Sequence, residues 1–175
     1  RNVAIGTSAL YSNTIGEDNV AVGIFTLLYN TTGLRNTATG NYGLVSNDSG
    51  GDNAAYGYQA LTNNTRGSQN VAMGPNTLLY NKGNNGSTAI GYQAMMNPDT
   101  SEFFPEQRTT YNTAIGYESL KGNYPPWNNT GTDNTATGAH TLKNNSAGSS
   151  NVAIGSRALF TNTTGNTNIA IGRSA

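Results

Sequence analysis

The sequence predicts an all-β protein whose chain winds as a parallel β-roll, a form of β-solenoid. Three observations favour this fold: an Ala-x-Gly core that recurs ten times, a constant spacing between most copies, and a composition rich in Asn, Thr, Ser and Gly. Only 35% of the 175 residues are hydrophobic, and the formal net charge is zero. Disordered chains usually combine low hydrophobicity with high net charge, so this composition indicates a repetitive fold stabilised by backbone pairing.

The repeat spacing predicts about ten coils in a single domain. From Gly6 to Gly172, successive core glycines lie 17 residues apart in seven of nine intervals. The other two intervals are 25 and 22 residues, so they carry insertions of 25 − 17 = 8 and 22 − 17 = 5 residues. We place these insertions at about residues 97–111 and 121–133. The chain begins and ends inside a repeat, so we expect it to be a fragment of a longer fibre protein.

Each repeat contains two segments that we expect to be β-strands. One alternates large and small residues, as in Val3-Ala4-Ile5, and the second pairs a small residue with Leu or Met, as in Ala9-Leu10. Asn and Gly, which tolerate a left-handed backbone, occupy the turns. Coils stacked ~4.8 Å apart would form a rod roughly 45–50 Å long. Asn19 and its equivalents every 17 residues predict a hydrogen-bonded ladder of side chains.

The alternation also predicts which side chains face outward. It places the central Ala on one face and its two neighbours on the other. Because Ala is present in every copy, we assign it to the interior, opposite the Leu or Met; the reverse assignment remains an alternative. The neighbours then form an exposed apolar stripe, which marks an interface. The candidate residues for a trimer interface are Val3, Ile5, Val20, Val22, Val71, Met73, Ile90, Ile115, Val152, Ile154, Ile169 and Ile171.

The two insertions are the candidate ligand site. They hold four of the five prolines, the only Trp and two of the four Phe. The fold does not require these residues, since the other coils close their turns with Asn and Gly. Loops on a rigid scaffold often bind ligands, and aromatic rings suit sugars or protein anchors. The alternative is that these rings only pack on one another or on a neighbouring subunit. The candidate ligand-binding residues are Glu102, Phe103, Phe104, Glu106, Arg108, Tyr111, Tyr124 and Trp127.

The composition offers little for catalysis or for several binding classes. His140 is the only histidine and there is no cysteine, so we expect no metal site, no cofactor and no enzymatic activity. The nine basic residues are scattered along the chain, which argues against nucleic-acid binding. No apolar run approaches the ~20 residues that cross a bilayer, so we expect no membrane insertion in this segment.

The motif Asn2-Val3-Ala4-Ile5-Gly6, repeated as Asn151-Val152-Ala153-Ile154-Gly155 and in the other copies, resembles the head repeats of YadA-like trimeric autotransporter adhesins. The resemblance covers essentially the whole chain, although the 17-residue period is longer than is usual for that family. It implies a left-handed parallel β-roll packed side by side as a homotrimer. The form Asn112-Thr113-Ala114-Ile115-Gly116-Tyr117 is also similar to repeats of tail-fibre-like surface proteins that end in a self-cleaving chaperone domain.

Three functions fit these observations. The first is a non-enzymatic extracellular adhesin or fibre segment, on a bacterial surface or virion, that binds a glycan or protein of a host or prey cell. The second is a purely structural shaft segment of a viral or phage-like tail fibre. The third is an ice-binding solenoid, suggested by Thr37-Ala38-Thr39 and Thr135-Ala136-Thr137. It is the weakest, because an ice-binding face needs that pattern in adjacent coils.

Overall fold

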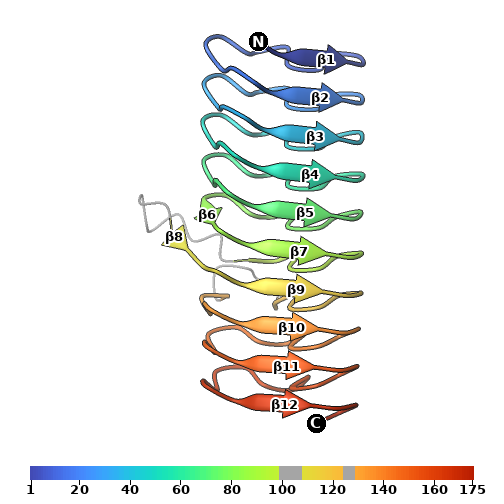
Figure 1. The fold of residues 1–175 in the computed structure, drawn as a ribbon, viewed down its shortest axis with the longest axis vertical. Coiled ribbons are helices and arrows are strands. Elements are labelled where there is room, and N and C mark those ends of the chain that lie inside the picture. Colours follow the sequence, from blue (N-terminus) through green and yellow to red (C-terminus); the bar gives the residue numbers. More distant parts are fainter. Residues whose placement is uncertain (99–107, 124–128) are drawn as a thin grey trace.

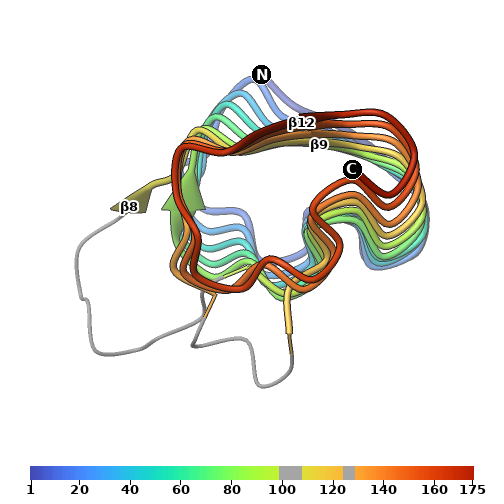
Figure 2. The same cartoon turned by 90° about the horizontal axis from the view of Figure 1, so that it is seen from below.

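The computed structural model describes residues 1–98, 108–123 and 129–175, and within them the chain forms strands and turns without a helix. Ten strands make one sheet in the order β1-β2-β3-β4-β5-β7-β9-β10-β11-β12, and β6 pairs with β8 in a second, two-stranded sheet. Figure 1 shows the strands of the large sheet stacked along one axis, and Figure 2 shows the coils superimposed along it. The predicted β-solenoid is confirmed. The strands are β1 (Val3–Ile5), β2 (Val20–Val22), β3 (Thr37–Thr39), β4 (Ala54–Tyr56), β5 (Val71–Met73), β6 (Asn84–Asn85), β7 (Thr88–Ile90), β8 (Arg108–Thr109), β9 (Thr113–Ile115), β10 (Thr135–Thr137), β11 (Val152–Ile154) and β12 (Ile169–Ile171).

Neighbouring strands pair in parallel with the central alanines in register, as Ala55 does with Ala72. These alanines point inward, and Ala55 is fully buried. Leucines such as Leu61 and Leu78, on the opposite wall, are also fully buried. The core therefore consists of one column of Ala facing one column of Leu or Met, as the sequence predicts. The small Ala side chain allows the two walls to approach closely.

The second predicted strand of each coil is absent, and the prediction was wrong on this point. Its residues form turns, because Phe25 and Leu27 both have a left-handed backbone, with φ of 55° and 52°. A chain with positive φ at alternate positions cannot extend as a strand. It curls around the inward leucine instead, while its amides still bond to the next coil, as Leu27 N does to Gly43 O at 3.0 Å.

Two columns of asparagine connect the coils. The strand-side ladder precedes the strands and includes Asn19, Asn36, Asn53 and Asn70; the turn-side ladder includes Asn13, Asn30, Asn47, Asn64 and Asn81. In the strand-side ladder, Asn36 Nδ2 donates to Asn19 Oδ1 at 3.1 Å, which confirms the predicted ladder. In the turn-side ladder, Asn47 Nδ2 donates to Asn30 Oδ1 at 2.7 Å. Where both ladders are present, they donate to the same carbonyl, since Gly50 O accepts from Asn36 at 2.8 Å and from Asn47 at 2.9 Å.

The core glycine after each strand is required by its backbone and its surroundings. Gly40 has a φ of 128°, and a Cβ built on it would lie 2.6 Å from Gly57 O in the next coil. The same close approach recurs at the next core glycine, Gly57. A column of glycines thus sets how closely the coils stack at the end of the strands.

Candidate functional site

The outward face of the ten-stranded sheet, which we call the strand face, is the first candidate surface. It consists of the first and third residues of each strand, the outer pair. Eight large hydrophobic side chains on it are 39–75% exposed: Val3, Ile5, Ile169 and Ile171 on the edge strands β1 and β12, and Tyr56, Met73, Ile115 and Ile154 on inner strands. Val20, Val22, Val71, Ile90 and Val152 are half-buried between their neighbours. All twelve candidate interface residues therefore point outward on one face.

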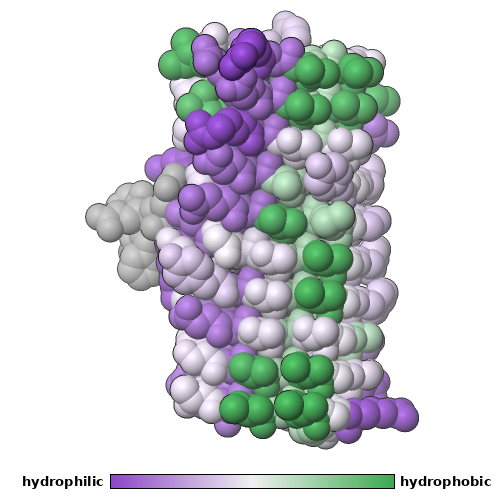
Figure 3. Space-filling view, in the orientation of Figure 1, coloured by the Kyte–Doolittle hydropathy of each residue, from purple (hydrophilic) through white to green (hydrophobic). Residues whose placement is uncertain are grey.

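The polarity of the strand face varies along the rod. Apolar side chains cover it over β1 and β2 and again over β11 and β12, as Figure 3 shows. The outer pairs of β3 and β10 are both Thr and Thr. Between β3 and β10, the third position of the strands carries Tyr56, Met73, Ile90 and Ile115. The exposed face is thus a continuous surface with apolar ends and a mixed centre.

The second candidate surface is the edge where the two insertions leave the rod. Their stems are hydrogen-bonded to each other: Asn97 N donates to Lys121 O at 2.9 Å, and Asn97 Nδ2 to Gly122 O at 3.3 Å. Asn129 is the centre of this junction, because its Nδ2 donates to Asn97 O at 2.6 Å and to Asn123 O at 2.7 Å, and its Oδ1 accepts from Asn123 N at 3.0 Å. The stems therefore lie side by side in consecutive coils, as the sequence predicts.

Only two of the predicted ligand-binding residues fall within the described residues. Arg108, in β8, donates from Nη2 to Thr130 O and so links the end of the first insertion to that of the second. Tyr111 is 67% exposed and lies against Gly86. The others, Glu102, Phe103, Phe104, Glu106, Tyr124 and Trp127, lie outside the described residues.

The insertions coincide with a break in the turn-side ladder. The ladder runs from Asn13 to Asn81 and resumes only with Asn145 and Asn162, so the β7 and β9 coils lack it. Asn81 Oδ1 is buried without a hydrogen-bond partner. A cavity of about 20 Å³ lies at the same level, lined in part by Asn84, Asn97, Asn129 and Asn145.

A buried ionic cluster bridges the coils that lack this ladder. Glu118, 8% exposed, receives Lys121 Nζ at 2.6 Å on Oε1 and Lys143 Nζ at 2.7 Å on Oε2. Lys121 also donates to Gln93 Oε1 at 2.8 Å. Burial works against ionisation of Glu118, but hydrogen bonds from the two lysines outweigh it and lower its pKa to about 2. The cluster therefore ties the β9 and β10 coils together by charge, and the hydrogen bond from Lys121 to Gln93 adds the β7 coil.

His140, the only histidine of the chain, belongs to this cluster. Its side chain is only 28% exposed, and Nδ1 lies 3.2 Å from Glu118 Oε2 without the alignment of a hydrogen bond. The His140 ring contacts Tyr117 edge to face, and Tyr117 stacks on Tyr92 with centroids 5.4 Å apart. Sequence reasoning missed the cluster. The available signal was polar or charged residues recurring two and five places after the core glycine in consecutive repeats.

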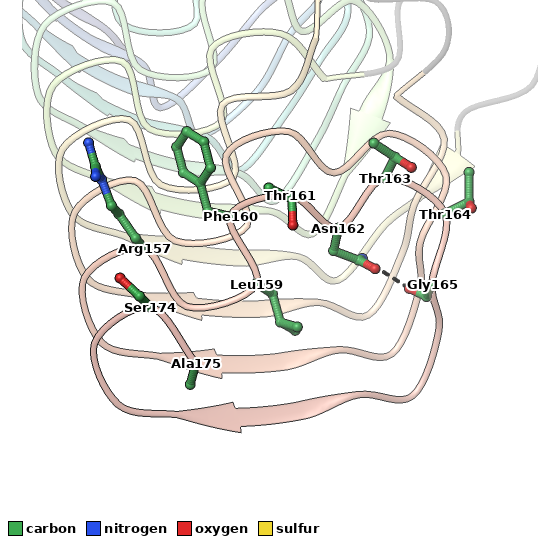
Figure 4. A pocket seen from close by; sticks show the side chains of 10 residues that line it. All are labelled: Arg157, Leu159, Phe160, Thr161, Asn162, Thr163, Thr164, Gly165, Ser174 and Ala175. Carbon is green, nitrogen blue, oxygen red and sulfur yellow. Dashed lines mark hydrogen bonds between the residues drawn. The ribbon is translucent and has the colours of Figure 1, made fainter.

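A large hollow lies below the β11 coil and is shown in Figure 4. It measures about 760 Å³, and its lining includes Leu159, Asn162 and Gly165 together with Ser174 and Ala175. In the upper coils, the equivalent space is filled by the following coil. The hollow is therefore where residues of a complete coil would stack, and its shape is not that of a ligand pocket.

Within residues 1–98, 108–123 and 129–175, no group of three or more His, Cys, Asp or Glu side chains is placed to hold a metal ion. The same part of the chain has no helix of the length and apolarity that crossing a membrane requires. Comparison of the sequence with protein-family models and curated proteins, and of the structure with solved structures, gave no match. The function is therefore inferred from the surfaces of this chain.

Proposed function

We propose that this chain is a non-enzymatic segment of an extracellular adhesive fibre that associates as a homotrimer through its strand face. The observation that carries the proposal is the row of outward Val, Ile, Met and Tyr side chains on a rod whose interior is already complete. On this proposal, the fibre stands on a bacterial cell surface or a virion. The edge that bears the insertions contacts a glycan or protein of another cell.

The energetics favour association through this face. Burying an apolar side chain completely contributes roughly 1.5–3 kcal/mol. Eight such residues on the strand face are 39–75% exposed, so each contributes about half of that, on the order of 6–12 kcal/mol in total. The cost of bringing chains together is about 4–15 kcal/mol. The apolar contribution of the strand face is therefore of the same size as the cost of association, so association would have to use the whole face, because a few coils contribute too little.

The test of association is the mass of the protein in solution. Light scattering should give three times the chain mass of 18.3 kDa. Replacing Val152→Asp together with Ile154→Asp should shift the mass toward that of a monomer, because the charges would lie in the apolar contact. A matched control places two Asp at Thr161 and Thr164, exposed residues of the same coil away from its strand, and should leave the mass unchanged. A wild-type monomer at micromolar concentration would contradict the proposal.

The test of adhesion removes the insertions. Shortening the β7 and β9 coils to the standard 17 residues, by deleting residues 101–108 and 124–128, removes every candidate ligand residue except Tyr111 and keeps the repeat. The trimmed protein should keep its mass and lose binding to a glycan array or to target cells. Binding that survives trimming would place the ligand site elsewhere. Loss of assembly on trimming would indicate that the insertions pack between subunits.

A structural shaft segment is the second candidate function, and the inter-coil hydrogen bonds favour it. They run from the β1 coil to the β12 coil through every strand pair of the large sheet. A shaft would keep its mass and show no ligand on the array. An ice-binding role has less support, since the Thr-Thr outer pairs of β3 and β10 are separated by four other strands of the sheet; a thermal hysteresis assay tests it.

A further inference from the structure

Three side chains of the Glu118 cluster bring together an amine, a carboxamide and a carboxylate. Lys121 Nζ donates to Gln93 Oε1 at 2.8 Å and to Glu118 Oε1 at 2.6 Å. Because a C=O bond is about 1.2 Å long, Lys121 Nζ lies within about 4 Å of the carboxamide carbon of Gln93, Cδ. A lysine amine attacks carbonyl carbon once it has lost its extra proton. The two hydrogen bonds therefore hold a nucleophile beside an acyl group.

The groups around this pair suit the transfer of the acyl group from one nitrogen to the other. General acid–base catalysis needs a proton acceptor and a proton donor within hydrogen-bond reach of the reacting atoms. On the side of the amine, the Glu118 carboxylate is the acceptor. On the side of the leaving group, Gln93 Nε2 donates to the Tyr92 hydroxyl at 3.2 Å, so the phenol is an acid next to that nitrogen.

The charges of the cluster favour the loss of one ammonium group. Lys121 and Lys143 share the carboxylate of Glu118, so these three groups sum to one positive charge. The side chains of Lys121 and Glu118 are only 22% and 10% exposed, and a largely buried excess charge is unfavourable. Conversion of the Lys121 ammonium to an amide leaves a balanced pair, Glu118 with Lys143.

We propose that the chain forms an isopeptide bond between Lys121 Nζ and Gln93 Cδ, in a single reaction of the chain on itself. The bond would join the β7 coil to the β9 coil, across 28 residues of sequence that include the first insertion. The turn-side ladder is missing from these coils. The isopeptide bond thus provides a covalent connection where that hydrogen-bonded connection is interrupted.

The atoms and protons balance without a further reagent. Lys121 Nζ loses one proton to water, bonds to Gln93 Cδ, and passes a second proton to Glu118 Oε1. The bond from Cδ to Nε2 breaks as Tyr92 gives its hydroxyl proton to Nε2, which leaves as ammonia. Water then carries the proton from Glu118 back to Tyr92. Because both reactants belong to one folded chain, the attack is intramolecular, which lowers the barrier to reaction of an otherwise inert amide.

Mass spectrometry of the denatured protein tests the proposal. After incubation at about pH 9, the wild-type chain should be lighter than its sequence by one molecule of ammonia. The cross-linked fraction should grow more slowly at about pH 7, because the amine must first lose a proton. Trypsin does not cut after a cross-linked lysine, so residues 83–108 and 109–143 should be recovered as one joined pair of peptides.

Variants assign the roles of the individual side chains. Lys121→Arg keeps the positive charge and should abolish the cross-link. The matched control, Lys143→Arg, changes the other lysine on Glu118 and should cross-link within twofold of the wild-type rate. Glu118→Gln and Tyr92→Phe remove the proton acceptor and the proton donor, and each should slow the reaction at least tenfold.

The mass of the wild-type chain decides the proposal without any variant. A chain that keeps its full sequence mass after the incubation at about pH 9 overturns it. Loss of ammonia with the two peptides still separate also overturns it, since cyclisation of Asn85 onto the amide of Gly86 would give the same mass. A cross-link that persists in Lys121→Arg overturns it too, because the bond would then involve another lysine.

Discussion

Asn97 and Asn129 belong to the stems of different insertions, and the side-chain amide of Asn129 donates to the backbone carbonyl of Asn97 at 2.6 Å. This single side chain also makes two hydrogen bonds to the backbone of Asn123. It is 9% exposed, so its hydrogen bonds form largely away from water. The bases of the two insertions are consequently held as one unit.

Asn129→Ala should loosen this junction. Net loss of a hydrogen bond costs about 0.5–1.5 kcal/mol, so the Asn123 amide, which donates to Asn129, should exchange its hydrogen roughly tenfold faster. The Gly138 amide, which donates to Ile115 in the sheet, is the internal reference and should not change. Equal protection of the Asn123 amide in both proteins would show that Asn129 does not hold the stems.

Replacing one rung of the turn-side ladder should be costly. Asn145 donates to Gly148 O at 2.8 Å and accepts from Asn162 at 2.8 Å, and it is 4% exposed. Asn145→Ala should lower stability by about 1–3 kcal/mol, because it leaves buried groups unpaired. The adjacent Asn144→Ala keeps the backbone carbonyl to which Asn123 donates and should change stability by less than about 0.5 kcal/mol. Urea unfolding of the two variants measures the difference, and equal midpoints would contradict the role of the ladder.

A methyl group at a core glycine should disrupt the stack. Gly40→Ala would place a Cβ 2.6 Å from Gly57 O at a φ of 128°, and we expect a loss of about 2 kcal/mol or more. Gly83→Ala is the control, because no heavy atom lies within 4 Å of the added Cβ. Thermal melts followed by circular dichroism should separate the two variants. Similar melting temperatures would mean that the coils adjust their spacing.

Stability should fall in acid as Glu118 becomes protonated. The folded-state pKa is about 2, below the 4.5 of an unperturbed glutamate, so the contribution is present above pH 4.5 and is lost as the pH falls toward 2. A shift of this size corresponds to about 3 kcal/mol. Glu118→Gln should be less stable at neutral pH, and its stability should fall less between pH 5 and pH 2. Glu17→Gln, at an exposed position, should follow the wild-type pH profile; identical profiles for all three proteins would contradict the assignment.

The sequence was sufficient for the parts of the fold that every coil repeats. Ala55 and Leu61 identify the two inner walls because only a small residue and a large apolar one recur there, and Asn53 identifies a ladder because its equivalents share one position. The second strand was mispredicted, since alternating sizes around Leu61 do not reveal its positive φ of 53°. The Glu118 cluster was missed because its polar and charged residues recur at fixed places in only two or three coils, and their contacts between those coils depend on the stacking of the structure.

The hydrogen bonds between coils run along the rod, which determines how the protein would respond to being pulled from its ends. Tension along this axis acts directly on the bonds between adjacent coils, and the weakest junction gives way first. Each coil that peels off releases 17 residues, which reach roughly 55–60 Å when fully extended, in place of a rise of ~4.8 Å. A tether of this design would lengthen in steps under load, and the coils still stacked would remain intact.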